Sequence, residues 1–410
     1  MKLAGAVLFL CTVALMGVGV VILTSIGNVQ GARIFGDPSH FCRQQLIFGA
    51  VGLACCAAVA CVPPSFWFDR RVAWTVAAFV VVALVAVHVP GLGYRANGST
   101  RWIRLPGLLL QPSEFIKIAA IVLSAWWLGA PGRDNGSFRE GVAVPVAGMG
   151  VVVAGFLSQP DLGSSIMLVL VNGALLFLSG ARLRWLLALG AAGLLLLAVF
   201  LAHDPVRMRR LSPRWQTFLR PLVVLVGHDR GDGAGDAFPP VEGKENFQLN
   251  MSLSALAAGG WTGRGLGESI YKHRYLPENH TDFIFAMVGE ELGLAATLSC
   301  VLLFLAMAAA GFYVAWRAPD RRTMLLAAGM TLQICLSAAV NVGVVTGAAP
   351  TKGLALPFLS YGGSNLIASV ATVGFLLAVA FRRGREDGPA ADDRPPIRPE
   401  FLPATDLWNG

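Results

Sequence analysis

The chain has 410 residues, of which 55% are hydrophobic and only 14% are charged. A water-soluble domain of this length carries more charge and cannot bury so much apolar surface, so the composition excludes an ordinary soluble fold. The formal net charge is +8, but the basic residues are scattered over many loops. That scatter argues against nucleic acid and favours membrane lipids or phosphates as partners.

Long apolar stretches without strand-like alternation predict an all-α polytopic membrane protein. Runs of about 20 apolar residues match the hydrocarbon core of a bilayer, and a membrane β-barrel would show period-two alternation instead. The stretch after Lys2 is too long for a signal peptide and lacks a clear cleavage site, so it is interpreted as an uncleaved first span. About ten transmembrane helices are expected, near residues 4–26, 45–62, 72–91, 113–130, 142–158, 164–181, 184–202, 282–314, 323–346 and 362–381.

The charges of the short connections predict the orientation. One set of connections carries most of the arginines, and the positive-inside rule places that set, with both termini, in the cytoplasm. Residues 1–385 are then one ten-span membrane domain, in which 203–281 is a large extracytoplasmic loop, and 386–410 is expected to be a disordered cytoplasmic tail. The arginines of the predicted cytoplasmic set are Arg70, Arg71, Arg133, Arg139, Arg182, Arg184, Arg317, Arg321, Arg322, Arg382, Arg383 and Arg385.

Cysteine and aspartate spacing gives no metal site. Six of the seven cysteines lie in apolar segments, and Cys42 is expected in a loop without a partner, so neither a disulfide framework nor a metal cluster is predicted. Asp229, Asp232 and Asp236 resemble part of a calcium loop. An EF-hand needs a glutamate at its twelfth position, where this chain has Pro240.

Residues 111–117 (QPSEFIK) open the fourth span with a polar group. Pro112 and Ser113 suit a helix start, and Glu114 and Lys117 are three residues apart on one helical face. Polar side chains at this depth of the membrane are energetically costly, so their presence indicates a structural or functional role. They are either a structural ion pair between helices or part of a polar cavity in which Lys117 faces a phosphate.

Residues 159–163 (QPDLG) form the tight outer turn between the fifth and sixth spans. Asp161 either caps the helix that follows, which contributes about 1 kcal/mol, or belongs to a site.

The densest polar cluster ends the long loop. Gly263, Gly265 and Gly267 do not follow a strand, so they are not a dinucleotide motif and are expected to permit tight turns. Asp282 would lie at the outer membrane interface, either as a helix cap or as a general base beside cations that could hold a diphosphate. Glu290 and Glu291 lie about two turns deeper, where at least one needs a partner. The other charged or polar members of the cluster are Lys272, Arg274, Glu278, Asn279, His280 and Thr281.

The connection between the last two spans is broken by proline and glycine. Its single charge is Lys352, and Ser360 and Ser364 lie in its second half. Such a segment can re-enter the membrane only where it lines a cavity.

Five blocks together resemble the FtsW/RodA (SEDS) family of bacterial cell-wall proteins. They occur in order over nearly the whole membrane region, and the 350–353 block (PTKG) is closer to the division branch than to the elongation branch. Asn365 departs from the pattern, since a second serine is expected there. The blocks are Asn97-Gly98 with Arg101-Trp102-Ile103, 111–117, 159–163, 276–286 (LPENHTDFIFA) and 356–364 (LPFLSYGGS).

The resemblance implies a ten-span fold and a peptidoglycan glycosyltransferase that polymerises lipid II at the outer face of the bacterial cytoplasmic membrane, at the division septum. It also implies a class B penicillin-binding protein as transpeptidase partner, together with other divisome proteins. The family's essential aspartate matches Asp282, and Glu114, Lys117 and Asp161 match polar positions of the family's central cavity. Substrate-binding candidates in and beside the blocks are Lys272, Arg274, His280, Lys352, Ser360 and Ser364.

The expected reaction is inverting sugar transfer. Asp282 would deprotonate the acceptor 4-hydroxyl, and undecaprenyl diphosphate would leave the donor. Basic residues, or a divalent cation such as Mg²⁺ or Mn²⁺, would offset the charge of the diphosphate, although no cofactor is obligatory. The alternatives are a transporter that flips lipid II, a non-catalytic divisome scaffold, and a RodA-like role in elongation.

Overall fold

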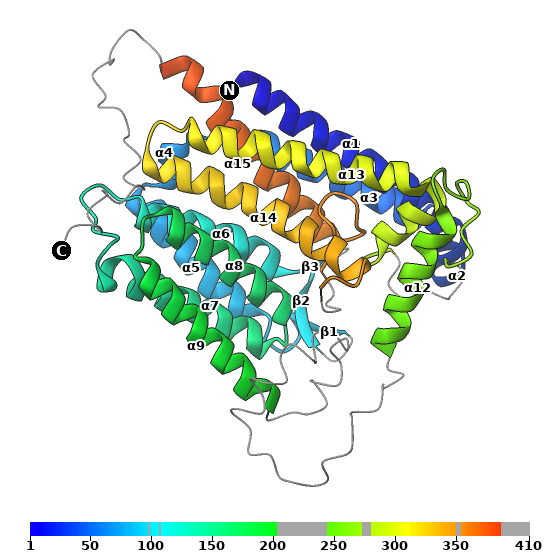
Figure 1. Ribbon diagram of the computed structural model, residues 1–410, viewed down its shortest axis with the longest axis horizontal. Helices are drawn as coiled ribbons and strands as arrows, with labels where there is room; N and C mark the ends of the chain where they lie inside the picture. The colour runs from blue at the N-terminus through cyan, green and yellow to red at the C-terminus, as the bar shows by residue number, and fades with distance from the viewer. Residues whose placement is uncertain (97–98, 106–107, 203–243, 273–279, 350–353, 387–410) are drawn as a thin grey trace, which may run out of the picture.

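A computed structural model describes residues 1–96, 99–105, 108–202, 244–272, 280–349 and 354–386 (Figure 1). The predictions made for residues 97–98, 228–240, 350–353 and 387–410 lie outside this part of the chain, as does most of the long loop.

Helices lie at the positions of all ten predicted spans and run side by side as a bundle (Figure 1). The helical positions are therefore confirmed, while the number of membrane crossings stays a prediction. These helices are α1 (Lys2–Ile26), α3 (His40–Cys61), α5 (Arg70–Ala86), α6 (Pro112–Leu128), α7 (Val144–Ser158), α8 (Leu162–Leu178), α9 (Leu183–Ala202), α13 (Ile284–Trp316), α14 (Arg321–Val345) and α15 (Gly363–Glu386).

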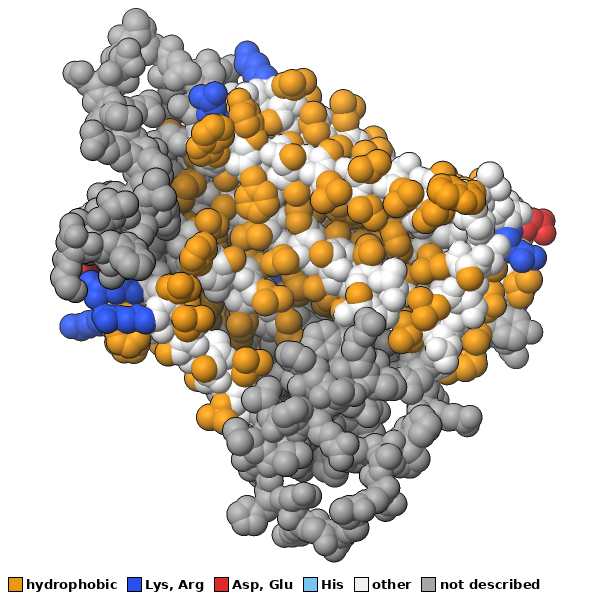
Figure 2. Space-filling model, in the orientation of Figure 1, with side chains coloured by type: hydrophobic (Ala, Val, Ile, Leu, Met, Phe, Trp, Pro, Cys, Tyr) orange, Lys and Arg blue, Asp and Glu red, His pale blue; other side chains and the backbone are white. Residues whose placement is uncertain are grey.

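The surface of the bundle is apolar, as a membrane protein requires. Six helical runs in the described residues are long and apolar enough to cross a bilayer. Leu302 and Leu305 on α13 are 64% and 59% exposed, and apolar side chains cover the visible face of the bundle (Figure 2). Water would not tolerate such a surface, so the chain is a multi-pass membrane protein. The six runs are Lys2–Phe35, His40–Cys61, Arg139–Ser158, Ile284–Trp316, Arg321–Val345 and Gly363–Phe381.

Short elements connect the long helices. The π-helical turn η1 (Gly27–Gly31) and α2 (Ala32–Phe35) continue α1, α4 (Pro64–Trp67) precedes α5, and the π-helical turn η2 (Arg139–Ala143) leads into α7. Cys42 lies within α3, so its expected loop position was wrong: the apolar stretch was predicted to begin at residue 45, and the helix starts earlier, at His40.

A three-stranded antiparallel sheet lies between α5 and α6, and the sequence analysis did not predict it. Its order is β1 (Gly93–Ala96), β2 (Ser99–Leu105) and β3 (Leu108–Leu110). Tyr94 pairs with Trp102, and Ile103 pairs with both Gly93 and Leu110. The central strand β2 is thereby held on both edges, which fixes the direction of its side chains.

The second half of the long loop contains a helix that was not predicted from the sequence. Helix α12 (Lys244–Gly259) packs against α13 and α14. Ser252 is fully buried, and its hydroxyl donates to the carbonyl of Val345 at the end of α14 (2.9 Å). The helix is short and mixes polar with apolar residues, so no membrane span was predicted at this position.

Helix α13 is broken at Gly293, where φ is 80° and ψ is −177°. The residues after α12 fill this break. The amide of Leu294 donates to Gly260 O (2.9 Å), and the amide of Arg264 donates to Glu290 O (2.9 Å). The loop thus pairs backbone groups that a helix interruption would otherwise leave without partners. The expected span over 282–314 is therefore two helical pieces.

The described part of the connection before α15 runs through protein. Phe358 and Leu359 are fully buried. The Nε2 of Gln45 on α3 donates to Phe358 O (3.3 Å), and Gly19 on α1 lies so close that an added Cβ would stand 2.9 Å from the Cα of Leu359. The segment is held between α1 and α3 and supports the start of α15.

Candidate functional site

A cavity of about 1060 Å³ opens at the end of the bundle that carries the sheet. It collects polar residues from β2, from the starts of α6, α8 and α15, and from the residues just before α13. Of the ten predicted site residues, six line it: Glu114, Lys117, Asp161, His280, Asp282 and Ser364.

Asp282 lies half-buried on the wall of this cavity, two residues before α13 begins. The N-cap residue of α13 is Phe283, so Asp282 is not the capping residue that the simpler interpretation required. Asn341 on α14 fixes its backbone, because the Asn341 Nδ2 donates to Asp282 O (2.8 Å) and to Leu354 O (2.6 Å). One amide thus joins the segment of Asp282 to the segment before α15.

Two further contacts join the same segments. The hydroxyl of Ser360 donates to Thr281 O (2.6 Å) and accepts from the amide of Leu356 (2.7 Å). The amide of Tyr361 donates to His280 O (2.9 Å). Ser360 is 1% exposed and does not line the cavity, so it holds the backbone beside Asp282 and is not placed to contact a substrate.

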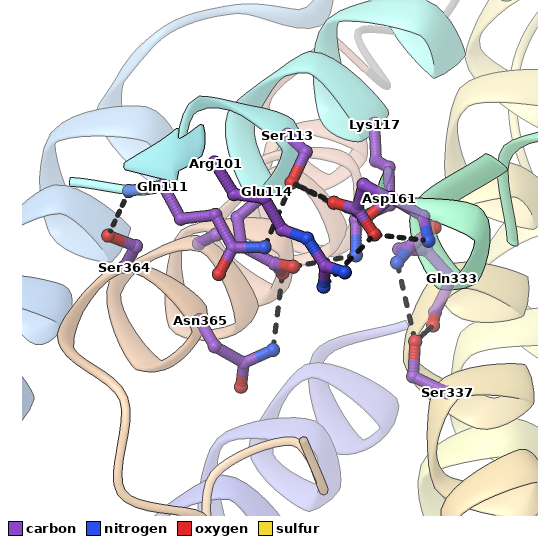
Figure 3. Close-up of polar contacts among 12 residues, drawn as sticks. Arg101, Gln111, Ser113, Glu114, Lys117, Asp161, Gln333, Ser337, Ser364 and Asn365 are labelled. Carbon is purple, nitrogen blue, oxygen red and sulfur yellow. Dashed lines mark hydrogen bonds and ion pairs between the residues drawn. The ribbon is translucent and has the colours of Figure 1, made fainter. Parts of the chain in front are cut away.

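Glu114 and Lys117 form the predicted pair at the start of α6. Lys117 Nζ lies 3.0 Å from Glu114 Oε1, and Asn365 donates to Glu114 Oε2 (3.2 Å; Figure 3). The Lys117 residue is only 3% exposed, yet both charged side chains line the cavity. The pair therefore joins α6 to α15 through Asn365 and also lines the cavity, while the phosphate contact expected for Lys117 stays a prediction.

Asp161 combines the two roles that its sequence context allowed. As N-cap of α8 it accepts from the amide (3.2 Å) and the hydroxyl (2.8 Å) of Ser164, and Ser113 on α6 donates to it (3.0 Å; Figure 3). It also lines the cavity and lies 4.0 Å from the guanidinium of Arg101. Arg101 donates to Pro160 O (2.6 Å) as well, which ties β2 to this turn.

Strand β2 supplies site residues that were not predicted as such from the sequence, although Arg101 and Trp102 belong to one of the family blocks. Arg101, Trp102 and Arg104 all line the cavity. The Arg104 guanidinium lies 4.2 Å over the ring of Tyr94 and is exposed. Only a strand prediction for this segment could have placed these side chains together.

Ser364 and Tyr361 also line the cavity. Ser364 accepts from the amide of Gln111 (2.8 Å; Figure 3), which joins α15 to the residue before α6. Burial raises the pKa of the Tyr361 phenol, so this group keeps its proton and can donate it in a hydrogen bond.

Lys272 lies elsewhere, although it was predicted to face a substrate. It is 2% exposed, and its ammonium lies 3.3 Å from Glu291 and 3.2 Å from the hydroxyl of Ser25 on α1. It also donates to Gly267 O. These contacts occupy the ammonium away from the cavity, so Lys272 ties the long loop to α1 and α13. Arg274 and Lys352 lie outside the described residues.

The two deep glutamates both have partners, as expected for at least one. Glu291 bonds to Lys272 and accepts from Ser25 (2.6 Å). Glu290 accepts from the Ser269 hydroxyl (2.5 Å) and the Ile270 amide (2.7 Å). The carboxylates therefore hold the end of the long loop against α13.

The loop glycines make the expected tight turns. Gly263, Gly265 and Gly267 have φ of 81°, 106° and 88°. An added Cβ at Gly263 would stand 2.2 Å from Glu291 O, so only glycine fits where the loop meets the break in α13.

Comparisons with known proteins agree with this architecture. A family model, FTSW_RODA_SPOVE (cell cycle protein), matches residues 6–384. A Trichlorobacter lovleyi protein named "Probable peptidoglycan glycosyltransferase FtsW" is 36% identical over 375 residues, which are 91% of this chain and 92% of the relative. Stage V sporulation protein E of Bacillus subtilis is 34% identical over 91% of this chain and 96% of its own length.

A solved chain described under "Structural coordination of polymerization and crosslinking by a peptidoglycan synthase complex" has a similar fold. Its TM-score is 0.67 at 24% identity, and the match covers 93% of this chain and 98% of that one. The family match spans nearly all of the membrane region described above. The chain therefore belongs to the FtsW/RodA/SpoVE family of cell cycle proteins.

Proposed function

We propose that this protein is a peptidoglycan glycosyltransferase that polymerises lipid II on the outer face of the bacterial cytoplasmic membrane. The observation that carries the proposal is one cavity that holds a carboxylate, Asp282, together with the cations Arg101, Arg104 and Lys117. A transfer that releases a diphosphate needs both a proton acceptor and positive charge, and the names of the relatives support this reaction class.

In the proposed reaction, Asp282 accepts the proton of the 4-hydroxyl of the acceptor's N-acetylglucosamine. The oxygen forms a bond to the anomeric carbon of the lipid-linked donor as the bond from that carbon to the diphosphate breaks. Undecaprenyl diphosphate leaves with the bonding electrons, the configuration inverts, and Asp282 later returns its proton to solvent.

Arg104 is the best candidate in the described residues to offset the charge of the diphosphate. It is exposed on the cavity and stacks on Tyr94, whereas Arg101 donates to Pro160 O and lies 4.0 Å from Asp161, and Lys117 forms an ion pair with Glu114. We expect Arg104→Gln to raise the KM for lipid II about tenfold, because one charge-assisted contact is lost. Arg95→Gln, on the neighbouring strand but not on the cavity, is the control.

The proposal includes a partner and a place in the cell. A solved relative acts in a peptidoglycan synthase complex, which supports a transpeptidase partner of the class B penicillin-binding type. Relatives named FtsW support a role in division at the septum. The arginine-rich connections support cytoplasmic termini.

Asp282→Asn tests the function most directly. The purified complex with its partner is supplied with lipid II in detergent, where flipping across a bilayer has no meaning, and glycan strands are measured on gels. Loss of the base should slow polymerisation by about 10²- to 10⁴-fold. Asp37→Asn is the control, because Asp37 is a carboxylate outside the cavity that accepts from Ser39. Normal polymerisation by Asp282→Asn would refute the proposal. A lipid II transporter and a non-catalytic scaffold would then be the remaining candidate functions.

A further inference from the structure

A second cavity, of about 630 Å³, lies at the opposite end of the bundle, where basic side chains gather (Figure 2). Its walls come from α4, from the α6–α7 and α13–α14 connections, and from α15. The positive-inside rule assigns this end to the cytoplasm. Three arginines line the cavity: Arg133, Arg321 and Arg322.

Two of these arginines lie against aromatic rings. The Arg133 guanidinium lies 3.7 Å from the ring centre of Trp127, and that of Arg322 lies 5.8 Å from the ring centre of Phe68. In both, the Nε is buried and has no hydrogen-bond partner in the described chain. The rings help to hold the planar groups in place, and no acceptor in the described chain bonds to either guanidinium, which suits an acceptor that enters the cavity.

The aspartates on the same cavity cap helices and form no ion pair with its arginines in the described chain. Asp69 caps α5 by accepting from the amide of Arg71 (2.7 Å), and Asp320 caps α14 by accepting from the amide (2.9 Å) and hydroxyl (2.6 Å) of Thr323. Among the described residues, none of the three cavity arginines makes an ion pair. Of the three, only Arg321 has a hydrogen-bond acceptor within the described residues, because its guanidinium donates to Ser179 O.

We propose that this cavity binds a phosphate ester, carried by an anionic phospholipid or by a small soluble phosphate compound. Planar guanidinium forks match phosphate oxygens, and basic pockets between transmembrane helices at the cytoplasmic side suit anionic headgroups. The volume suits a headgroup or a small molecule. Arginines that serve only the orientation of the chain need no shared cavity and no stacking, and Arg139 at the same end is such a residue.

Lipid binding to the purified full-length protein tests the site. Protein in neutral detergent is titrated separately with short-chain phosphatidylglycerol, with phosphatidylcholine of equal chain length, and with inorganic phosphate. Bound lipid is counted by native mass spectrometry, and Tm is recorded for each titration. We expect phosphatidylglycerol to bind and raise Tm and phosphatidylcholine to do neither. The double variant Arg133→Gln/Arg322→Gln should weaken binding about tenfold or more, and Arg139→Gln should leave it unchanged.

The arms distinguish the two sources of phosphate. If inorganic phosphate displaces phosphatidylglycerol at millimolar concentration, a soluble phosphate compound suffices; if it does not, the lipid is the ligand. Should the double variant fail to fold, the comparison of phosphatidylglycerol with phosphatidylcholine on the unaltered protein still decides. Equal binding of both lipids, or an equal loss in Arg139→Gln, would overturn the proposal. The test does not depend on polymerisation and stands apart from the proposed function.

Discussion

Replacing Asn341 by leucine tests whether backbone placement of Asp282 matters for the reaction. The change keeps the approximate size of a side chain that is 1% exposed, and it removes the donors to Asp282 O (2.8 Å) and Leu354 O (2.6 Å). Each lost hydrogen bond costs about 1 kcal/mol net, and up to about 3 kcal/mol if the carbonyl stays buried and unpaired. Both acceptor residues are half-buried, so the sum is about 2–4 kcal/mol.

Part of this free energy should reach the transition state of the proposed reaction, because Asp282, the proposed base, is then less well held in place. A factor of ten in rate corresponds to about 1.4 kcal/mol, so polymerisation should fall by roughly 10- to 100-fold. The assay follows glycan strands made from lipid II in detergent by the partner-bound protein, and Tm is measured on the same preparation.

Asn172→Leu is the matched control for Asn341→Leu. Asn172 is also 1% exposed, donates to Leu168 O (2.8 Å) and accepts from the hydroxyl of Ser124 (2.7 Å), away from the cavity. It should lower Tm similarly and leave the rate of the folded protein unchanged. If Asn341→Leu polymerises at the parental rate, or if both variants slow it equally, the positioning argument is wrong.

Two further predictions concern stability. Lys272→Met should lower the free energy of unfolding by about 3–5 kcal/mol, because Glu291 stays buried without its cation. Adding Glu291→Leu should recover part of this loss of stability. A Tm of the double variant equal to or below that of Lys272→Met would contradict the prediction. Gly19→Ala should lower Tm, since its Cβ would meet Leu359 at 2.9 Å, whereas Gly17→Ala, with nothing within 4 Å, should raise helix stability by about 0.5–1 kcal/mol. Equal effects of the two alanines on Tm would refute the packing argument.

Local patterns in the sequence predicted the local features of the site. Asp161 follows Pro160 ahead of an apolar run, which is enough to predict a helix cap, and the spacing of Glu114 and Lys117 is enough to predict their pairing. The length of the apolar stretches predicted the positions of the long helices. These features depend on residues within one helical turn of each other, or on composition over about 20 residues.

The features that the sequence analysis missed depend on distant contacts. Lys272 resembles a surface cation in sequence, and its burial follows from partners on α1 and α13 that only the fold brings to it. The break at Gly293 depends on backbone groups of the loop after α12. The sheet is made of strands of three to seven residues, too short for a clear period-two signal, so the placement of Arg101 and Arg104 on the cavity could not be seen.

The joining of two distant segments has a consequence for biosynthesis. Asp282 depends on Asn341 and on a connection ending at α15, the last described helix, so a nascent chain that leaves the ribosome amino end first carries the carboxylate long before its supports exist. The pocket is completed only when the final hairpin inserts. A truncated product ending before residue 354 would therefore present an aspartate without the finished chamber around it, because Leu354, Ser360 and Tyr361 would be missing.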